Sequence, residues 1–176
     1  MKSALEAALR GLSRRAYTHW ELAKLLGGKG FSPEEIAEAC ERLVEWGYLD
    51  DCRYARQYAH YRAWQQTRRQ LSAGLARRGV DAAIVQDVLA EVYPPEQEME
   101  NCRNMAQKLW REEMVRLDRQ LARQGTFAAA GSEAEDQADE AQMLFQARVR
   151  VGRKLARRGY PAHVIRAALE DLHCPR

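Results

Sequence analysis

The sequence predicts an all-α protein built from tandem three-helix repeats. Three times a basic helical stretch ends in a basic residue, a glycine and a large apolar residue, at Lys29-Gly30-Phe31, Arg78-Gly79-Val80 and Arg158-Gly159-Tyr160. Apolar residues recur at the same places around each glycine: four residues before it stand Leu26, Leu75 and Leu155, and six after it Ile36, Val85 and Ile165. Helical spacing on both sides of a glycine indicates two helices joined by a tight turn, and no stretch shows sustained strand alternation.

The predicted repeats are residues 1–48, 49–94 and 95–176. A single three-helix unit of this size buries only a small core. Stacked units cover each other's apolar edges, so we expect them to form an elongated, curved helical array. Such an array has long faces and few deep pockets, which favours an interaction surface over a catalytic site.

In the first repeat, an amphipathic helix is predicted over about residues 3–14. Thr18, followed three residues later by Glu21, predicts a capping box at the start of the second helix. That helix is expected to stop at Gly27-Gly28, because glycine often ends a helix in the left-handed conformation.

The third helix of this repeat has the strongest start signal in the chain. Ser32 is placed as N-cap, Pro33 as the first helical residue and Glu35 as the capping-box acid. Gly47 ends the helix. Cys40 lies where the other repeats have leucine, so we expect it to be a small buried apolar residue.

In the second repeat, Asp50 or Asp51 is expected to cap the first helix and Asp81 the third. Pro94-Pro95 ends the repeat, since proline cannot continue a helix interior. Four aromatic residues follow one helical stripe: Tyr54, Tyr58, Tyr61 and Trp64. They could stack nucleic-acid bases, but their three- and four-residue steps favour a core between units.

The third repeat is longer. Its first helix is predicted to extend toward Leu121, and a surface-loop insertion is predicted near residues 125–138. A final helix pair is expected over about 139–158 and 161–173. Pro161 stands where the earlier repeats have a capping side chain, so this helix is expected to begin without one.

Nothing in the sequence indicates catalysis. The four cysteines have no CxxC spacing, and the four histidines have no ligand spacing. A metal-dependent enzyme with zinc held through Cys52 and His60 is an alternative, although tetrahedral zinc needs four ligands. Asp50 and Asp51 are better explained as helix-cap residues than as catalytic carboxylates. We therefore expect no enzyme activity, no cofactor and no metal.

The net charge of +3 conceals two strongly basic stretches. The first contains no acid and holds Arg53, Arg56, Arg62, Arg68, Arg69, Arg77 and Arg78. The second, over residues 141–169, is also without acids and holds Arg148, Arg150, Arg153, Lys154, Arg157, Arg158 and Arg166. Solvated helix faces usually mix in acids, so these stretches favour binding to a polyanion or an acidic protein groove. No apolar run is long enough to span a bilayer and no apolar signal core opens the chain, which predicts a cytoplasmic protein.

Five segments in order resemble the RecX family of bacterial recombination regulators. They are Thr18-His19-Trp20-Glu21-Leu22, Lys29-Gly30-Phe31, Gly47-Tyr48-Leu49-Asp50-Asp51-Cys52-Arg53-Tyr54-Ala55, Arg77-Arg78-Gly79-Val80 and Arg157-Arg158-Gly159-Tyr160. The third segment is the most specific, since it resembles the family's Gly-Tyr-Leu-Asp-Asp signature. Leu25 and Gly74 depart from the family pattern, which commonly has a charged residue at these positions.

The resemblance implies three tandem three-helix repeats that bind the RecA recombinase and its filament on single-stranded DNA. It further implies inhibition of recombination, of ATP hydrolysis and of the coprotease activity of RecA in the SOS response, with weak direct binding to DNA and no role for a membrane. On this reading, the partner-binding basic faces consist of Arg53, Arg56, Arg62, Arg68, Arg69, Arg77, Arg78, Arg150, Arg153, Lys154, Arg157 and Arg158. The alternative is a helix-turn-helix regulator that reads duplex DNA with residues 18–46.

Overall fold

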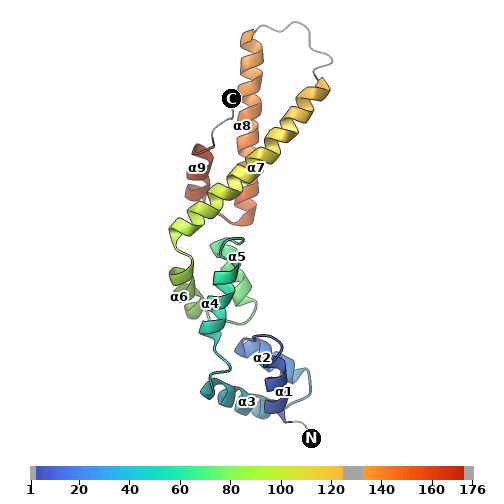
Figure 1. Ribbon diagram of the computed structural model, residues 1–176, viewed down its shortest axis with the longest axis vertical. Helices are drawn as coiled ribbons and strands as arrows, with labels where there is room; N and C mark the ends of the chain where they lie inside the picture. Colours follow the sequence, from blue (N-terminus) through green and yellow to red (C-terminus); the bar gives the residue numbers. More distant parts are fainter. Residues whose placement is uncertain (1–2, 125–132, 173–176) are drawn as a thin grey trace. The chain divides into compact units, whose positions relative to one another are not determined.

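The computed structural model describes the backbone of residues 3–124 and 133–172, and the side chains of these residues except 123, 124 and 133–140. Within this part of the chain the regular secondary structure is entirely helical, which confirms the predicted fold class (Figure 1). The chain divides into two compact units, Met1–Pro94 and Pro95–Arg176.

Each unit is built from three-helix groups. The first unit contains α1 (Ala4–Leu12), α2 (His19–Gly27), α3 (Pro33–Glu45), α4 (Asp51–Arg62), α5 (Arg68–Ala76) and α6 (Ala82–Val92). The second unit contains α7 (Pro95–Gln124), α8 (Glu133–Arg158) and α9 (Ala162–Glu170). Within the second unit α7 packs against both α8 and α9.

Most helices begin where the sequence predicts. The side chains of Thr18, Ser32 and Asp50 accept hydrogen bonds from backbone N–H groups in the first turns of α2, α3 and α4. Asp81 does the same for α6, and Pro161 starts α9 without a side-chain cap, both as expected. These caps satisfy donors that a helix start leaves unpaired, and so they fix where each helix begins.

The three basic–glycine–apolar turns share one geometry. Gly30, Gly79 and Gly159 have φ values of 86°, 73° and 94°, in the left-handed region. The apolar residue that follows each glycine donates its N–H back to a leucine carbonyl five residues earlier: Phe31 to Leu26, Val80 to Leu75 and Tyr160 to Leu155. This places the apolar side chain of each turn against the helix that it has just left. The repeat signature of the sequence is therefore a helix-stop motif.

Each three-helix group has its own apolar core. In the first group Leu22, Leu26 and Leu43 are fully buried with Cys40, as expected for that cysteine. Burial raises the pKa of the Cys40 thiol. Leu71 and Leu75 occupy the matching places in the second group, and Val151 and Leu155 in the third.

Two predictions about helix ends are wrong. The predicted loop over 125–138 is too long, because α8 begins at Glu133; residues 125–132 lie outside the described part of the chain. Gly28, at the end of α2, has right-handed helical geometry (φ −65°), and the left-handed residue is Gly30. The early start of α8 has a physical reason. Alanine and acids, which are frequent in the predicted loop, are compatible with helix, and acids near a helix N-terminus stabilise it.

Candidate interaction surface

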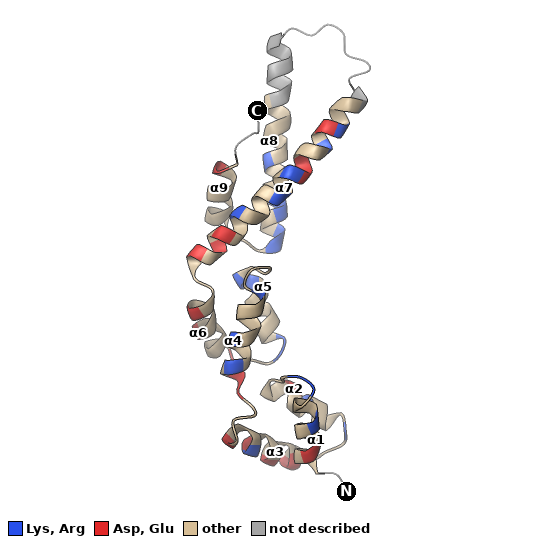
Figure 2. Ribbon diagram, in the orientation of Figure 1, with Lys and Arg blue, Asp and Glu red and all other residues tan. Residues whose placement is uncertain are grey.

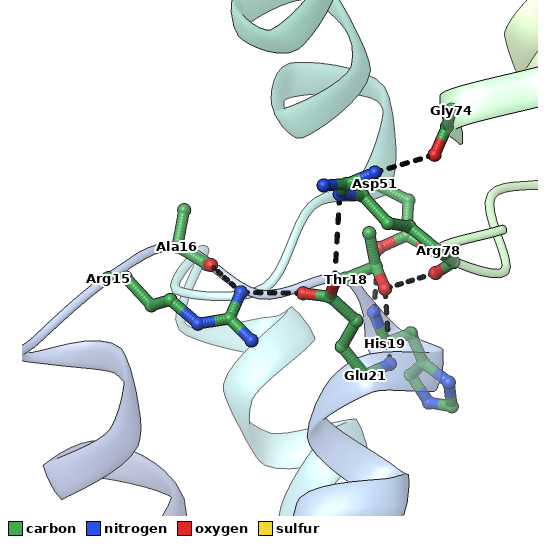
Figure 3. A network of polar contacts seen from close by, with 8 residues as sticks. All are labelled: Arg15, Ala16, Thr18, His19, Glu21, Asp51, Gly74 and Arg78. Carbon is green, nitrogen blue, oxygen red and sulfur yellow. Dashed lines mark hydrogen bonds and ion pairs between the residues drawn. The ribbon is translucent and has the colours of Figure 1, made fainter. Parts of the chain in front are cut away.

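The first and second repeats meet at a polar network centred on Thr18 (Figure 3). Its hydroxyl accepts from the N–H of Glu21, as a cap should, and donates to the carbonyl of Arg78 in the second repeat at 2.5 Å. The N–H of His19 donates to a carboxylate oxygen of Asp51 at 2.8 Å. Asp50 is thus the cap of α4, and Asp51 connects the two repeats.

Glu21 does not close the predicted capping box. Its carboxylate accepts a hydrogen bond from Arg15 at 2.7 Å and lies 3.7 Å from the guanidinium nitrogen Nε of Arg78. The two charge-assisted contacts with arginine stabilise this carboxylate more than a single hydrogen bond from the Thr18 N–H would, so the capping box stays open. Arg78 therefore helps to hold the first and second repeats together.

A close apolar contact accompanies this network. A Cβ atom placed on Gly79 would lie 2.3 Å from the Cβ atom of Trp20. Only glycine allows this approach, and its positive φ also favours glycine. The turn of the second repeat is thus fitted against the α2 helix of the first.

Several cations of the second repeat are held by backbone carbonyls or rings. Arg68 donates to the carbonyls of Leu89 and Tyr93 at 2.8 and 2.9 Å, where α6 ends. Arg78 donates to the carbonyl of Gly74 at 2.8 Å. Both arginines thus bind carbonyls near helix ends, which is a structural role, although both were expected from the sequence to bind a partner.

The remaining contacts in this repeat are weaker or more exposed. Arg53 donates to the Gly47 carbonyl at 2.6 Å, and Arg56 forms an exposed ion pair with Glu91 at 2.9 Å. Arg62 and Arg78 both lie over the ring of Tyr58, at 4.5 and 4.7 Å from its centroid. Arg77 contacts only a carbonyl of its own helix, that of Ala73, at 3.3 Å.

In the second unit two cations of α8 converge on one buried carboxylate of α7, with Arg116 of α7 itself at 4.0 Å. Glu113 on α7 is 1% exposed, and it accepts hydrogen bonds from Arg150 at 2.9 Å and from Lys154 at 2.6 Å, both on α8. Burial by itself would raise the pKa of Glu113, but the hydrogen bonds and charges of Lys154 and Arg150 outweigh it and lower that pKa. Arg150 and Lys154 therefore help to hold α8 on α7.

Glu113 was not expected as a site residue, although the sequence carries a signal for it. It lies four residues after Leu109 and four before Leu117, on the buried stripe of α7. An acid on an apolar stripe requires a partner, because an unpaired buried charge is costly. The acid-free stretch over residues 141–169 made Arg150 and Lys154 look free, whereas their counter-charge lies about forty residues away in the sequence.

Of the cations predicted from the sequence to bind a partner, four stay available in the described part of the chain. Among the residues that the structure describes, Arg69, Arg153 and Arg157 are exposed and have no hydrogen-bond or ion-pair partner, and Arg77 bonds only within its own helix. Arg153 and Arg157 are one helical turn apart, so they share a face of α8. Arg158 is also exposed, but it is engaged in a contact. Figure 2 shows basic residues over α5 and over the C-terminal half of α8.

The aromatic stripe divides into two parts. Tyr54 and Tyr58 are partly buried against the core of their own repeat, whereas the prediction was a core between units. Tyr61 and Trp64 are 81% and 65% exposed, so the prediction that they form a core between units is wrong. Tyr61 lies in the last turn of α4, and Trp64 follows the end of that helix.

The charges on α3 disfavour the helix-turn-helix alternative. In a helix-turn-helix reading of residues 18–46, α3 would enter the DNA groove, yet its exposed residues include Glu34, Glu38, Glu41 and Glu45 (Figure 2). Its single arginine, Arg42, is paired with Glu38 at 3.0 Å. Carboxylates along this helix would repel phosphates.

Over the described residues, no three metal-ligating side chains gather at one place, and none of the helices is both long and apolar enough to cross a bilayer.

Tandem three-helix groups with exposed arginines define a helical-repeat protein. Family models for the first and second three-helix domains of RecX match residues 4–43 and 50–89. The chain is 33% identical over 166 residues to the regulatory protein RecX of Trichlorobacter lovleyi, covering 93% of this chain and 92% of that protein. The chain belongs to the RecX family of regulatory proteins.

Two further relatives agree with this assignment. The regulatory protein RecX of Caldanaerobacter subterraneus is 37% identical over 108 residues, and this stretch spans 55% of that protein and 61% of this chain. The crystal structure of RecX from Lactobacillus salivarius superposes with a TM-score of 0.71, covering 96% of this chain and 94% of that one at 19% identity. At that identity the likeness supports the fold.

Proposed function

We propose that this chain binds the RecA recombinase and its filament on single-stranded DNA, and that it restrains filament growth. Inhibition of strand exchange, of ATP hydrolysis and of repressor cleavage follows from that restraint. Membership of the RecX family supports the proposal, together with the four cations Arg69, Arg77, Arg153 and Arg157, which the fold leaves exposed and without carboxylate partners.

The arrangement of these cations suits an extended acidic partner. Arg69 and Arg77 lie on one side of α5 and its end, and Arg153 and Arg157 lie on one face of α8. Arginine binds carboxylate and phosphate through two parallel hydrogen bonds, which favours acidic protein surface and DNA backbone alike. A filament presents the same site at regular spacing, so weak contacts from two units gain from effective concentration.

The structure also sharpens which residues should be tested. Arg68 and Arg78 close helix ends and the joint between repeats, so reversing their charge would damage the fold as well as the surface. Arg69→Glu with Arg77→Glu changes the surface alone. The matched control is Lys24→Glu with Arg42→Glu, two reversals in the first repeat outside this face.

The experiment measures RecA ATP hydrolysis on single-stranded DNA with substoichiometric protein. The Arg69→Glu and Arg77→Glu variant should need roughly tenfold more protein for the same inhibition, since each exposed contact contributes about 0.2–1 kcal/mol. Its inhibition should also depend less steeply on salt. The Lys24 and Arg42 control should inhibit like the unaltered protein. Equal inhibition by all three proteins would remove the proposed role of this surface, and no inhibition by the unaltered protein would refute the function.

A further inference from the structure

The first repeat contains a pocket that the basic stretches do not include. It has a volume of about 430 Å³ and lies between α1, α2 and the turn after α2. Its floor is apolar, with Gly11 of α1, Leu25 of α2 and Phe31 of the turn. Gly11 keeps the floor deep, because a Cβ atom there would already lie 3.2 Å from a methyl group of Leu25.

Three cations line the same pocket: Arg10, Arg14 and Lys29. Among the described residues, the side chains of Arg14 and Lys29 have no hydrogen-bond or ion-pair partner, and the Arg10 side chain donates only to the Glu6 carbonyl of its own helix at 3.3 Å. No carboxylate is among the residues that line the pocket. Cations gathered over an apolar floor without counter-charge are complementary to an anionic ligand that also has an apolar part.

The second repeat shows that this pocket is a feature of the first repeat and not of the fold. Gly74 stands five residues before the turn glycine, where the first repeat has Leu25. The hydroxyl of Tyr58 lies over Gly74, where an added Cβ atom would be 2.3 Å away, so the tyrosine fills the space between α4 and α5. Arg78, the counterpart of Lys29, lies over the Tyr58 ring. In the second repeat the Tyr58 side chain thus fills the space and contacts the cation, whereas the corresponding space and cation of the first repeat remain open to a ligand.

The chemistry of the lining favours a peptide over a nucleic acid. The polar side-chain groups at the pocket are the three cations, which only donate, and the Tyr17 hydroxyl. A carboxylate only accepts, as these donors require; a phosphate does the same, but a base edge also presents donors, for which the lining offers the Tyr17 hydroxyl alone. Arg15 lies 3.6 Å from the Tyr17 ring centroid, so one face of the ring at the pocket is already occupied.

We propose that this pocket binds an acidic peptide segment of a partner protein. One apolar side chain of the segment rests on Leu25 and Phe31, and carboxylates on either side of it pair with Arg14 and Lys29. The site is distinct from the α5 and α8 faces, and the proposal does not depend on which protein carries the segment.

The test uses the full chain and a fluorescent seven-residue peptide with a central leucine between glutamates, followed by fluorescence anisotropy at low salt. Arg14→Ala with Lys29→Ala should weaken binding by about five- to twentyfold, from two charge contacts in a partly enclosed site. The matched control, Arg42→Ala with Lys24→Ala, removes the same charge from the same repeat outside the pocket and should change affinity less than about twofold.

Two further ligands test whether the apolar side chain is recognised and whether the pocket binds nucleic acid instead. A peptide with serine in place of leucine should bind at least about fivefold more weakly, because it loses the apolar contact. A single-stranded oligothymidylate tests the nucleic-acid reading. Failure of the leucine peptide to bind at millimolar concentration would overturn the proposal, as would equal binding by the pocket variant or by the serine peptide. Oligothymidylate binding that needs Arg14 and Lys29, without peptide binding, would assign the pocket to nucleic acid instead. None of these results depends on RecA inhibition.

Discussion

The second and third repeats both contain long basic stretches without acids, but they hold their cations in different ways. In the second repeat, Arg68 binds backbone carbonyls, and Arg78 binds a carbonyl and lies over the Tyr58 ring, with one carboxylate, that of Glu21, at 3.7 Å. In the third repeat, Arg150 and Lys154 bind the buried carboxylate of Glu113. Partners without charge orient an arginine with little loss of positive charge, whereas Glu113 offsets one of the two charges of Arg150 and Lys154.

This difference affects what each surface can offer a partner. A carbonyl or an aromatic ring carries no net charge, so its arginine still contributes to the field around the second repeat. Glu113 carries a full negative charge within 3 Å of two cations of the third repeat. The comparison predicts that the second repeat contributes more to binding an acidic partner than the third.

The largest effect is expected at the turn by which the second repeat packs against the first. Gly79→Ala places a Cβ atom 2.3 Å from Trp20 in a backbone with φ of 73°, and should destabilise the first unit by about 2–4 kcal/mol. Gly30→Ala has the same backbone strain but meets nothing within 4 Å, so about 1 kcal/mol is expected. Urea unfolding measures both. Equal losses would show that the turn of the second repeat does not depend on the first.

Glu113→Gln should have the next largest effect, on the second unit. It removes the charge that two cations share and leaves a buried amide, at a cost of about 2–3 kcal/mol; full burial of both partners would cost more, but Arg150 and Lys154 are 33% and 41% exposed. Because the pKa of Glu113 is lowered in the folded state, its contribution is complete above the unfolded pKa and is lost as the pH falls through the folded one.

The difference in stability between Glu113→Gln and the unaltered protein should therefore be constant near neutral pH and shrink below about pH 4. Thermal unfolding followed across this range measures it. A difference that does not change with pH would mean that the carboxylate charge is not what holds α8 on α7.

Arg68→Ala and Arg69→Ala separate structural from exposed cations in the second repeat. Arg68→Ala removes two charge-assisted hydrogen bonds at the end of α6 and should cost about 1–2 kcal/mol, since water can reach part of the site. Arg69→Ala has no partner to lose and should change stability by less than about 0.5 kcal/mol. Chemical denaturation of the two variants side by side tests this, and a larger loss for Arg69→Ala would reverse the assignment.

The smallest effect is expected when the exposed cations of the third repeat are reversed. Arg153→Glu with Arg157→Glu should raise the concentration needed to inhibit RecA ATP hydrolysis by about threefold, less than the corresponding pair in the second repeat. The same assay of both variants at two salt concentrations compares the repeats directly. A larger effect in the third repeat would contradict the charge argument drawn from Glu113.

Much of the fold follows from local sequence. The caps at Thr18, Ser32 and Asp81 and the turn glycines Gly30 and Gly79 were identifiable, because capping and left-handed turns involve groups only a few residues apart. The start of α8 was missed, since alanine and acids are compatible with both helix and loop. The domain boundaries within the chain stay a prediction.

Less of the candidate surface could be predicted from the sequence. The sequence identified the basic stretches, but only the packing shows that Arg68, Arg78, Arg150 and Lys154 have internal partners. It also shows that Tyr61 and Trp64 are exposed while Tyr58 fills the space over Gly74. The pocket of the first repeat gave no local signal at all, because Gly11, Leu25 and Phe31 are brought together by three separate segments.

The sequence by itself determined the helices, their repeated stop motif and the family to which the chain belongs. These depend on interactions within a few residues, and a periodic pattern records them directly. The tertiary structure decided which cations are free, since the partners of Arg68, Lys154 and Thr18 lie from about twenty to sixty residues away. A charge is available for binding only after the packing of the chain has determined which groups lie beside it.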